Sequence, residues 1–97
     1  MKQPLRVLIV DDSENDAELT VNEVTRGGYA VTSERVQTAE TMKEALEHDT
    51  WDLVLSDYTM PAFSGPAALA VLQASGRDVP FIIISGTIGE ETAVSAL

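Results

Sequence analysis

Short apolar runs alternate along the chain with segments of mixed polarity, and this alternation predicts strands and helices in turn. The apolar and β-branched runs indicate strands, at residues 5–10, 29–36, 51–56 and 79–84. Helices are predicted between them: Ser13 and Thr38 are suited to cap two of these, and Pro66 suits the first turn of a third. The acidic pair Glu90-Glu91 predicts the start of a fourth helix.

The spacing of the strands predicts the fold class. Strands begin near residues 5, 29, 51 and 80, so each interval holds one strand, one crossover helix and two short loops. Such a rhythm is typical of an α/β fold with a doubly wound parallel sheet covered by helices on both faces. The sequence ends within the predicted fourth helix, and we therefore expect residues 1–97 to form a single, incomplete domain.

Composition narrows the function classes. The chain has 97 residues and a formal net charge of −10, with 16 acidic and 6 basic residues. This balance disfavours direct binding to nucleic acid, which needs clustered Lys and Arg. Its apolar runs are too short to span a membrane, and it has no cysteine for disulfides or thiolate metal sites. We expect a cytoplasmic domain without direct contact to a membrane.

Polar residues end three of the predicted strands. Asp11 and Asp12 follow the first strand, Asp57 follows the third, and Ser85 follows the fourth. The carboxyl ends of parallel strands meet at one edge of a sheet, so these side chains are expected to converge there. Clustered carboxylates without His or Cys favour Mg²⁺ or Mn²⁺. An aspartate beside such an ion can act as a nucleophile toward a phosphoryl group, and a nearby hydroxyl such as that of Ser85 can bind a phosphoryl oxygen.

These motifs resemble the receiver domain of two-component response regulators. The matching stretches have the family's spacing and cover essentially the whole chain, at residues 7–13, 52–61, 64–65 and 80–86. The resemblance implies a CheY-like, flavodoxin-like fold with strand order 2-1-3-4, from which the fifth strand and fifth helix are missing. It also implies a phosphorylatable signalling switch rather than a turnover enzyme.

The resemblance assigns roles to individual residues. Asp57 is implied as the phosphoacceptor, which takes a phosphoryl group from a histidine kinase or a phosphotransfer domain. Asp12 is implied as a direct Mg²⁺ ligand and Asp11 as a ligand through water. Asp57 and the Thr59 carbonyl are implied as further ligands. The Ser85 hydroxyl is implied to sense the phosphoryl group. Residues implied to shape the loop after the acceptor are Met60, Pro61 and Gly65.

Two departures from the family pattern affect the expected function. The family places a Lys after its fifth strand, whereas this sequence has only Lys2 and Lys43, and neither is in that position. Loss of the fifth strand would also leave the apolar strand 81–84 at an edge of the sheet. Because flat, uncharged edge strands pair with other chains, we expect copies to associate through this edge.

Two other functions compete with the phosphoacceptor hypothesis. The missing Lys favours a degenerate receiver that serves as a non-signalling interaction or dimerisation module. The second competing function is an aspartyl-phosphate hydrolase of the haloacid dehalogenase type. That enzyme class uses an Asp-x-Asp motif after its first strand. Here the two residues, Asp11 and Asp12, are contiguous, which counts against that enzyme class.

Overall fold

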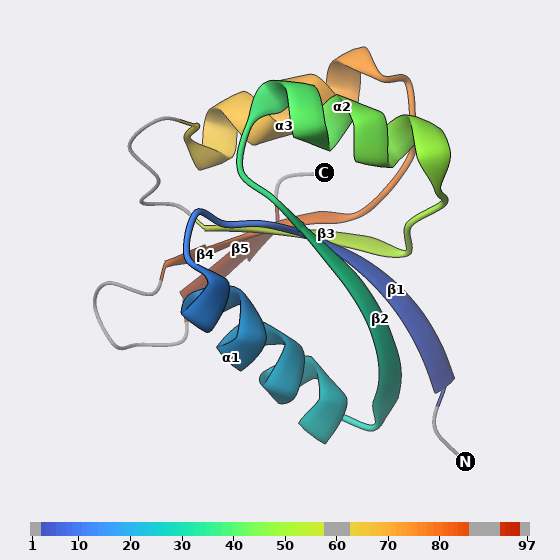
Figure 1. The fold of residues 1–97 in the computed structure, drawn as a ribbon, viewed down its shortest axis with the longest axis vertical. Helices are drawn as coiled ribbons and strands as arrows, with labels where there is room; N and C mark the ends of the chain where they lie inside the picture. The colour runs from blue at the N-terminus through green and yellow to red at the C-terminus, as the bar shows by residue number, and fades with distance from the viewer. Residues whose placement is uncertain (1–2, 58–62, 86–91, 96–97) are drawn as a thin grey trace.

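A computed structural model describes residues 3–57, 63–85 and 92–95 as one sheet flanked by helices (Figure 1). The sheet has five strands in the order β2-β1-β3-β4-β5. Their bounds are β1 Gln3–Val10, β2 Tyr29–Val36, β3 Leu53–Asp57, β4 Phe81–Ser85 and β5 Thr92–Ser95. The helices are α1 Glu14–Arg26, α2 Ala39–His48 and α3 Gly65–Ala74.

The first four strands confirm the predicted doubly wound sheet. β1 pairs in parallel with both β2 and β3, and β3 pairs in parallel with β4. Two strands begin later than the sequence predicts, at Leu53 and Phe81 instead of residues 51 and 79. The reasons are local. The Trp51 side chain packs under α2 before the strand begins, and Pro80 has no N–H to donate to a ladder.

Polar side chains fix where the helices begin. The Ser13 hydroxyl accepts a hydrogen bond from the Asp16 N–H at the start of α1. Thr38 and Thr41 form a reciprocal capping box at the start of α2. Pro66 lies in the first turn of α3. Backbone N–H groups in that turn have no acceptor within the helix, so the lack of an N–H in proline costs no helical hydrogen bond. These three helix starts agree with the sequence prediction.

The helices divide the core into two layers, one on each face of the sheet (Figure 1). Successive residues of β1 alternate between these layers: Val7 and Ile9 pack on the α1 side, whereas Leu8 and Val10 pack on the side of α2 and α3. All four are buried. Burial on both faces explains why the strand is apolar without alternation. No helix in the described part of the chain is long and apolar enough to cross a membrane.

The C-terminal segment corrects the predicted fourth helix and the predicted position of strand 81–84 at the edge of the sheet. The predicted fourth helix is wrong for residues 92–95, which form β5 and pair antiparallel with β4, Ile84 opposite Ala93. Pairing satisfies backbone N–H and C=O groups along β4 that would otherwise lack partners, whereas an isolated short helix gains little in water. β5 therefore occupies the edge at residues 81–84 through which copies were predicted to associate.

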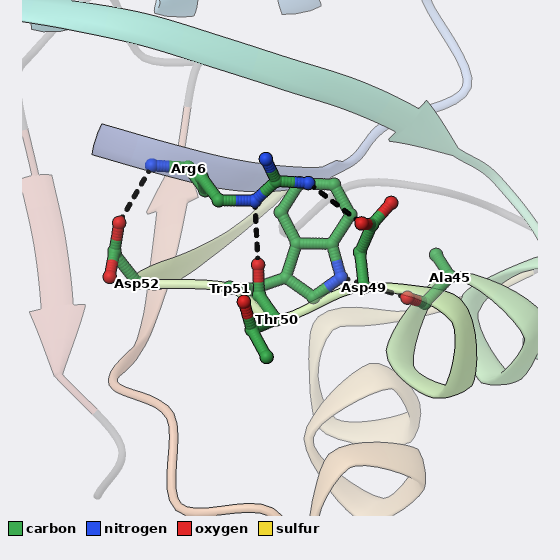
Figure 2. A network of polar contacts seen from close by, with 6 residues as sticks. All are labelled: Arg6, Ala45, Asp49, Thr50, Trp51 and Asp52. Atoms are coloured by element: carbon green, nitrogen blue, oxygen red, sulfur yellow. Dashed lines mark hydrogen bonds and ion pairs between the residues drawn. The ribbon is translucent and has the colours of Figure 1, made fainter. Parts of the chain in front are cut away.

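Arg6 joins the start of β1 to the segment that leads into β3 (Figure 2). Its backbone N–H donates to Asp52 Oδ2 at 2.9 Å, and its Nε donates to the Thr50 carbonyl at 2.9 Å. Its Nη2 lies 2.9 Å from Asp49 Oδ1, and the guanidinium carbon lies 5.4 Å from the centroid of the Trp51 ring. This network lies at the end of the strands opposite to Asp11 and Asp57, so it serves the fold.

We expect Arg6→Ala to lower the free energy of unfolding by about 1–2 kcal/mol, because it removes the hydrogen bond to the Thr50 carbonyl, the ion pair with Asp49 and the packing of the arginine stem on Trp51. Arg26→Ala is the matched control, since Arg26 makes a single exposed ion pair with Glu23. Its cost should stay below about 0.5 kcal/mol. Urea unfolding measures both values, and equal losses in the two variants would contradict a structural role for the Arg6 network.

Candidate metal centre

Three carboxylates meet at the carboxyl edge of the sheet. Asp11 and Asp12 directly follow β1, and Asp57 ends β3. β1 and β3 are paired neighbours with Val10 opposite Ser56, so the next positions along the two strands lie side by side. One oxygen from each carboxylate lies within 4.8 Å of the others. The structure thus brings together the three acids that the sequence analysis predicted to converge.

The three acids differ in exposure. Asp11 is buried, Asp57 is half-buried and Asp12 is exposed. A cavity of about 220 Å³ opens beside them between α1 and the sheet. Its lining combines the carboxylates of Asp11, Asp16 and Asp57 with apolar side chains that include Leu19 and Ile84. A small ligand could therefore reach Asp57 from the α1 side.

Backbone contacts hold the turn that carries Asp11. The Asp11 N–H donates to the Val36 carbonyl at 2.9 Å, which ties the turn to the end of β2. Its carboxylate Oδ1 accepts from the Ser13 N–H at 2.9 Å, just before α1 begins. Its carbonyl accepts from Arg35 Nη1 at 3.2 Å. Hydrogen bonds within the protein therefore anchor the turn to β2 and to the start of α1.

Burial raises the pKa of Asp11 from 3.8 to about 6. The Ser13 N–H opposes this rise, whereas the neighbouring carboxylates of Asp57, Asp16 and Asp12 add to it. Charged oxygens in this position therefore repel one another in a partly dry site. A divalent cation would relieve that repulsion, and an all-oxygen ligand set suits Mg²⁺ or Mn²⁺. The three carboxylates fit such an ion.

The other predicted site residues are placed only in part. Gly65 is the buried first residue of α3, and a Cβ there would lie 3.3 Å from Ile83 Cδ1, so a larger residue would press on β4. Ser85 is the last residue of β4, at the same edge as Asp57. Thr59, Met60 and Pro61 lie outside the described residues.

Sequence reasoning missed several residues that contribute to the site. Asp16, Leu19 and Thr20 line the cavity from α1, and Arg35 contacts the turn from β2. A signal existed for Arg35, because it lies at the end of a predicted strand, as the acids do. The α1 residues that line the cavity are harder to predict from the sequence, since acidic and apolar residues are common on helix surfaces that bind no ligand.

The strand order and the acidic edge define a class of doubly wound α/β domain that binds its ligand where the strand order reverses. Within that class, residues 7–97 match the family model described as the response regulator receiver domain. The chain belongs to this family. The resemblance that the sequence motifs indicated is thus confirmed, including the flavodoxin-like order 2-1-3-4 of the first four strands.

A response regulator is among the proteins to which this chain is similar. The chain is 27% identical over 94 residues to the response regulator MprA of Mycolicibacterium vanbaalenii, and the match covers 97% of this chain but 40% of MprA. The chain thus spans less than half the length of that relative.

Two solved structures are also similar. One is the receiver domain of the sensor histidine kinase PA1611 from Pseudomonas aeruginosa, with magnesium coordinated in its active-site cleft (TM-score 0.67, 24% identity, 87% of this chain and 69% of that chain). The other is a chain from the complex of the histidine kinase ThkA with the response regulator TrrA (TM-score 0.66, 28% identity, 89% of this chain and 70% of that chain).

Asp11→Asn should stabilise the metal-free protein, because Asn keeps an acceptor for the Ser13 N–H but carries no charge. At pH 4 Asp11 is mostly protonated in the folded state, so the variant and the wild type should be similarly stable. Between pH 4 and pH 6, the Asp11 carboxyl is ionised in the unfolded chain but still largely protonated in the folded protein. The wild type therefore loses stability relative to the variant as the pH rises toward 6.

The advantage of Asp11→Asn should therefore grow between pH 4 and about pH 6 and stay constant above that range. Urea unfolding in the presence of a chelator, repeated across this pH range, measures the difference. An advantage that is independent of pH would contradict the raised pKa of Asp11.

Proposed function

We propose that this chain is a phosphoacceptor receiver domain that takes a phosphoryl group onto Asp57 with Mg²⁺ bound beside it. The observation that carries the proposal is the convergence of Asp11, Asp12 and Asp57, with oxygens within 4.8 Å, in a chain of the receiver family. Asp12 serves as the direct ligand, and Asp11 acts through water. The Thr59 carbonyl completes the protein's share, as the family resemblance implies.

The transfer is a substitution at phosphorus. A carboxylate oxygen of Asp57 attacks the phosphorus of a phosphohistidine, a P–O bond forms, and the P–N bond to the imidazole breaks. The imidazole leaves with the electron pair of that bond and takes a proton from solvent. Bound Mg²⁺ supplies charge neutralisation for the phosphoryl oxygens. Asp57 suits the role of nucleophile because it is half-buried, ends β3 and lines the cavity.

Other residues of the chain support this transfer. The Ser85 hydroxyl contacts the phosphoryl group from the end of β4, while Met60, Pro61 and Gly65 shape the loop after the acceptor. Lys43 does not take the place that the family gives to its Lys, because Lys43 lies in α2, on the face of the sheet opposite to α1 (Figure 1).

The partner is a histidine kinase or a phosphotransfer domain, encountered in the cytoplasm. Support comes from the structural similarity to a chain of a kinase–regulator complex. The α1 surface also suits a partner with an apolar patch, because Leu19 lines the cavity beside Asp57 yet is 62% exposed. The domain acts as a switch that is phosphorylated and then loses its phosphoryl group slowly, and it has no substrate to turn over.

Phosphoramidate, a small donor with a P–N bond, tests the acceptor assignment without a kinase. With Mg²⁺ present, intact-mass spectrometry should show one added phosphoryl group on the wild type and none on Asp57→Asn. Asp78→Asn is the matched control, because Asp78 is an exposed acid between α3 and β4, outside the cavity and the three-carboxylate cluster, and it should be labelled like the wild type. Chelating Mg²⁺ should abolish labelling.

The outcomes separate the competing functions. Equal labelling of Asp57→Asn and the wild type would show that Asp57 is not the acceptor. Continuous release of phosphate without a stable phosphoprotein would favour the hydrolase. Absence of both labelling and Mg²⁺ binding would favour a non-signalling interaction module.

A further inference from the structure

Arg35 reaches from the end of β2 to the turn that carries the candidate metal ligands. Its Nη1 donates to the Asp11 carbonyl at 3.2 Å and to Gln37 Oε1 at 3.0 Å. We infer that Arg35 is a positioning residue that holds the Asp11–Asp12 peptide in the orientation needed to bind the divalent cation. This inference rests on the proposed function, since it assumes that Asp11 and Asp12 bind the ion.

The fixed carbonyl constrains the following residue. A trans peptide is planar, so holding the Asp11 carbonyl toward β2 also fixes the direction of the Asp12 N–H and restricts how the Asp12 side chain leaves the turn. The Asp11 N–H is already tied to the Val36 carbonyl, and its carboxylate to the Ser13 N–H. The Arg35 contact is thus the third anchor of this turn, and it acts on the peptide that joins Asp11 to Asp12.

Two glutamates line the same cavity as Arg35 and could accept hydrogen bonds from it. Glu14 and Glu18 on α1 line a cavity of about 320 Å³ together with Arg35 and Ile9. Within the described parts of the chain, however, Arg35 forms no ion pair with either glutamate, and its guanidinium instead contacts the turn. The register of β2 explains this direction, because Arg35 pairs with Ile9, two residues before Asp11.

Hydrogen bonding should matter more than charge in this role. Arg35 is exposed, so water and salt screen its attraction to the nearby carboxylates. Orientation of a ligand-bearing peptide is less sensitive to salt. Residues that orient metal ligands typically change metal affinity by about 10–100-fold when mutated, and an exposed contact to a backbone carbonyl should lie near the lower end.

The test is a calorimetric titration of the full chain with MgCl₂ alone, at low salt and at high salt. Arg35→Met removes every donor but keeps an apolar stem, and it should weaken Mg²⁺ binding about 10-fold at both salt concentrations. Arg35→Lys can still donate to the carbonyl and should recover affinity to within about 3-fold of the wild type. Arg26→Met removes the same charge at the far end of α1 and should bind like the wild type.

A second readout needs no metal. In the metal-free protein, amide hydrogen exchange at Asp12 and Ser13 should accelerate in Arg35→Met but not in Arg26→Met, while the global unfolding midpoints of the two variants stay similar. This measurement separates a local loss of order in the turn from general destabilisation.

The inference is overturned if Arg35→Met binds Mg²⁺ as tightly as Arg26→Met, if its defect disappears at high salt, or if Arg35→Lys is as weak as Arg35→Met. Failure of the proposed function is distinguishable, because the wild type itself would then fail to bind Mg²⁺, and the inference would fall with it.

Discussion

The parallel pairing of β1 with β3 fixes the distance between the residues on which the proposed function depends. Both strands end at the same edge of the sheet, and their register places the position after Val10 beside the position after Ser56. Asp11 and Asp57 therefore meet although 46 residues separate them in sequence. A slip of one residue in this register would turn side chains to the opposite face and separate the carboxylates.

Apolar burial protects this register at an electrostatic cost. β1 is buried on both faces, so neither core layer tolerates a shift of the strand. The same burial desolvates Asp11 and raises its pKa to about 6, and the neighbouring carboxylates add to the effect. The folded domain thus keeps mutually repelling carboxylates at the carboxyl edge of the sheet, and a divalent cation would relieve this repulsion. Hydrogen bonds from Ser13 and Arg35 hold the turn that carries Asp11.

The sequence predicted the parts of this arrangement that depend on local pattern. Val7–Val10 and the run before Asp57 are apolar enough to indicate buried strands, and parallel strands must bring their carboxyl ends together. β5 could not be predicted in this way, because residues 92–95 gain their pairing from β4 rather than from their own preference. The position of Arg35 near the end of a predicted strand was a signal, but its partner could not be predicted, because that partner is a backbone carbonyl 24 residues away.

The central claim is that Asp11, Asp12 and Asp57 together bind a divalent cation, and that the raised pKa of Asp11 couples this binding to the release of a proton near pH 6. Calorimetric titration with MgCl₂ in two buffers of different ionisation enthalpy measures the protons released on binding. The account predicts release of about half a proton near pH 6 and almost none at pH 8. Binding without proton release at pH 6, or no binding at either pH, would contradict it.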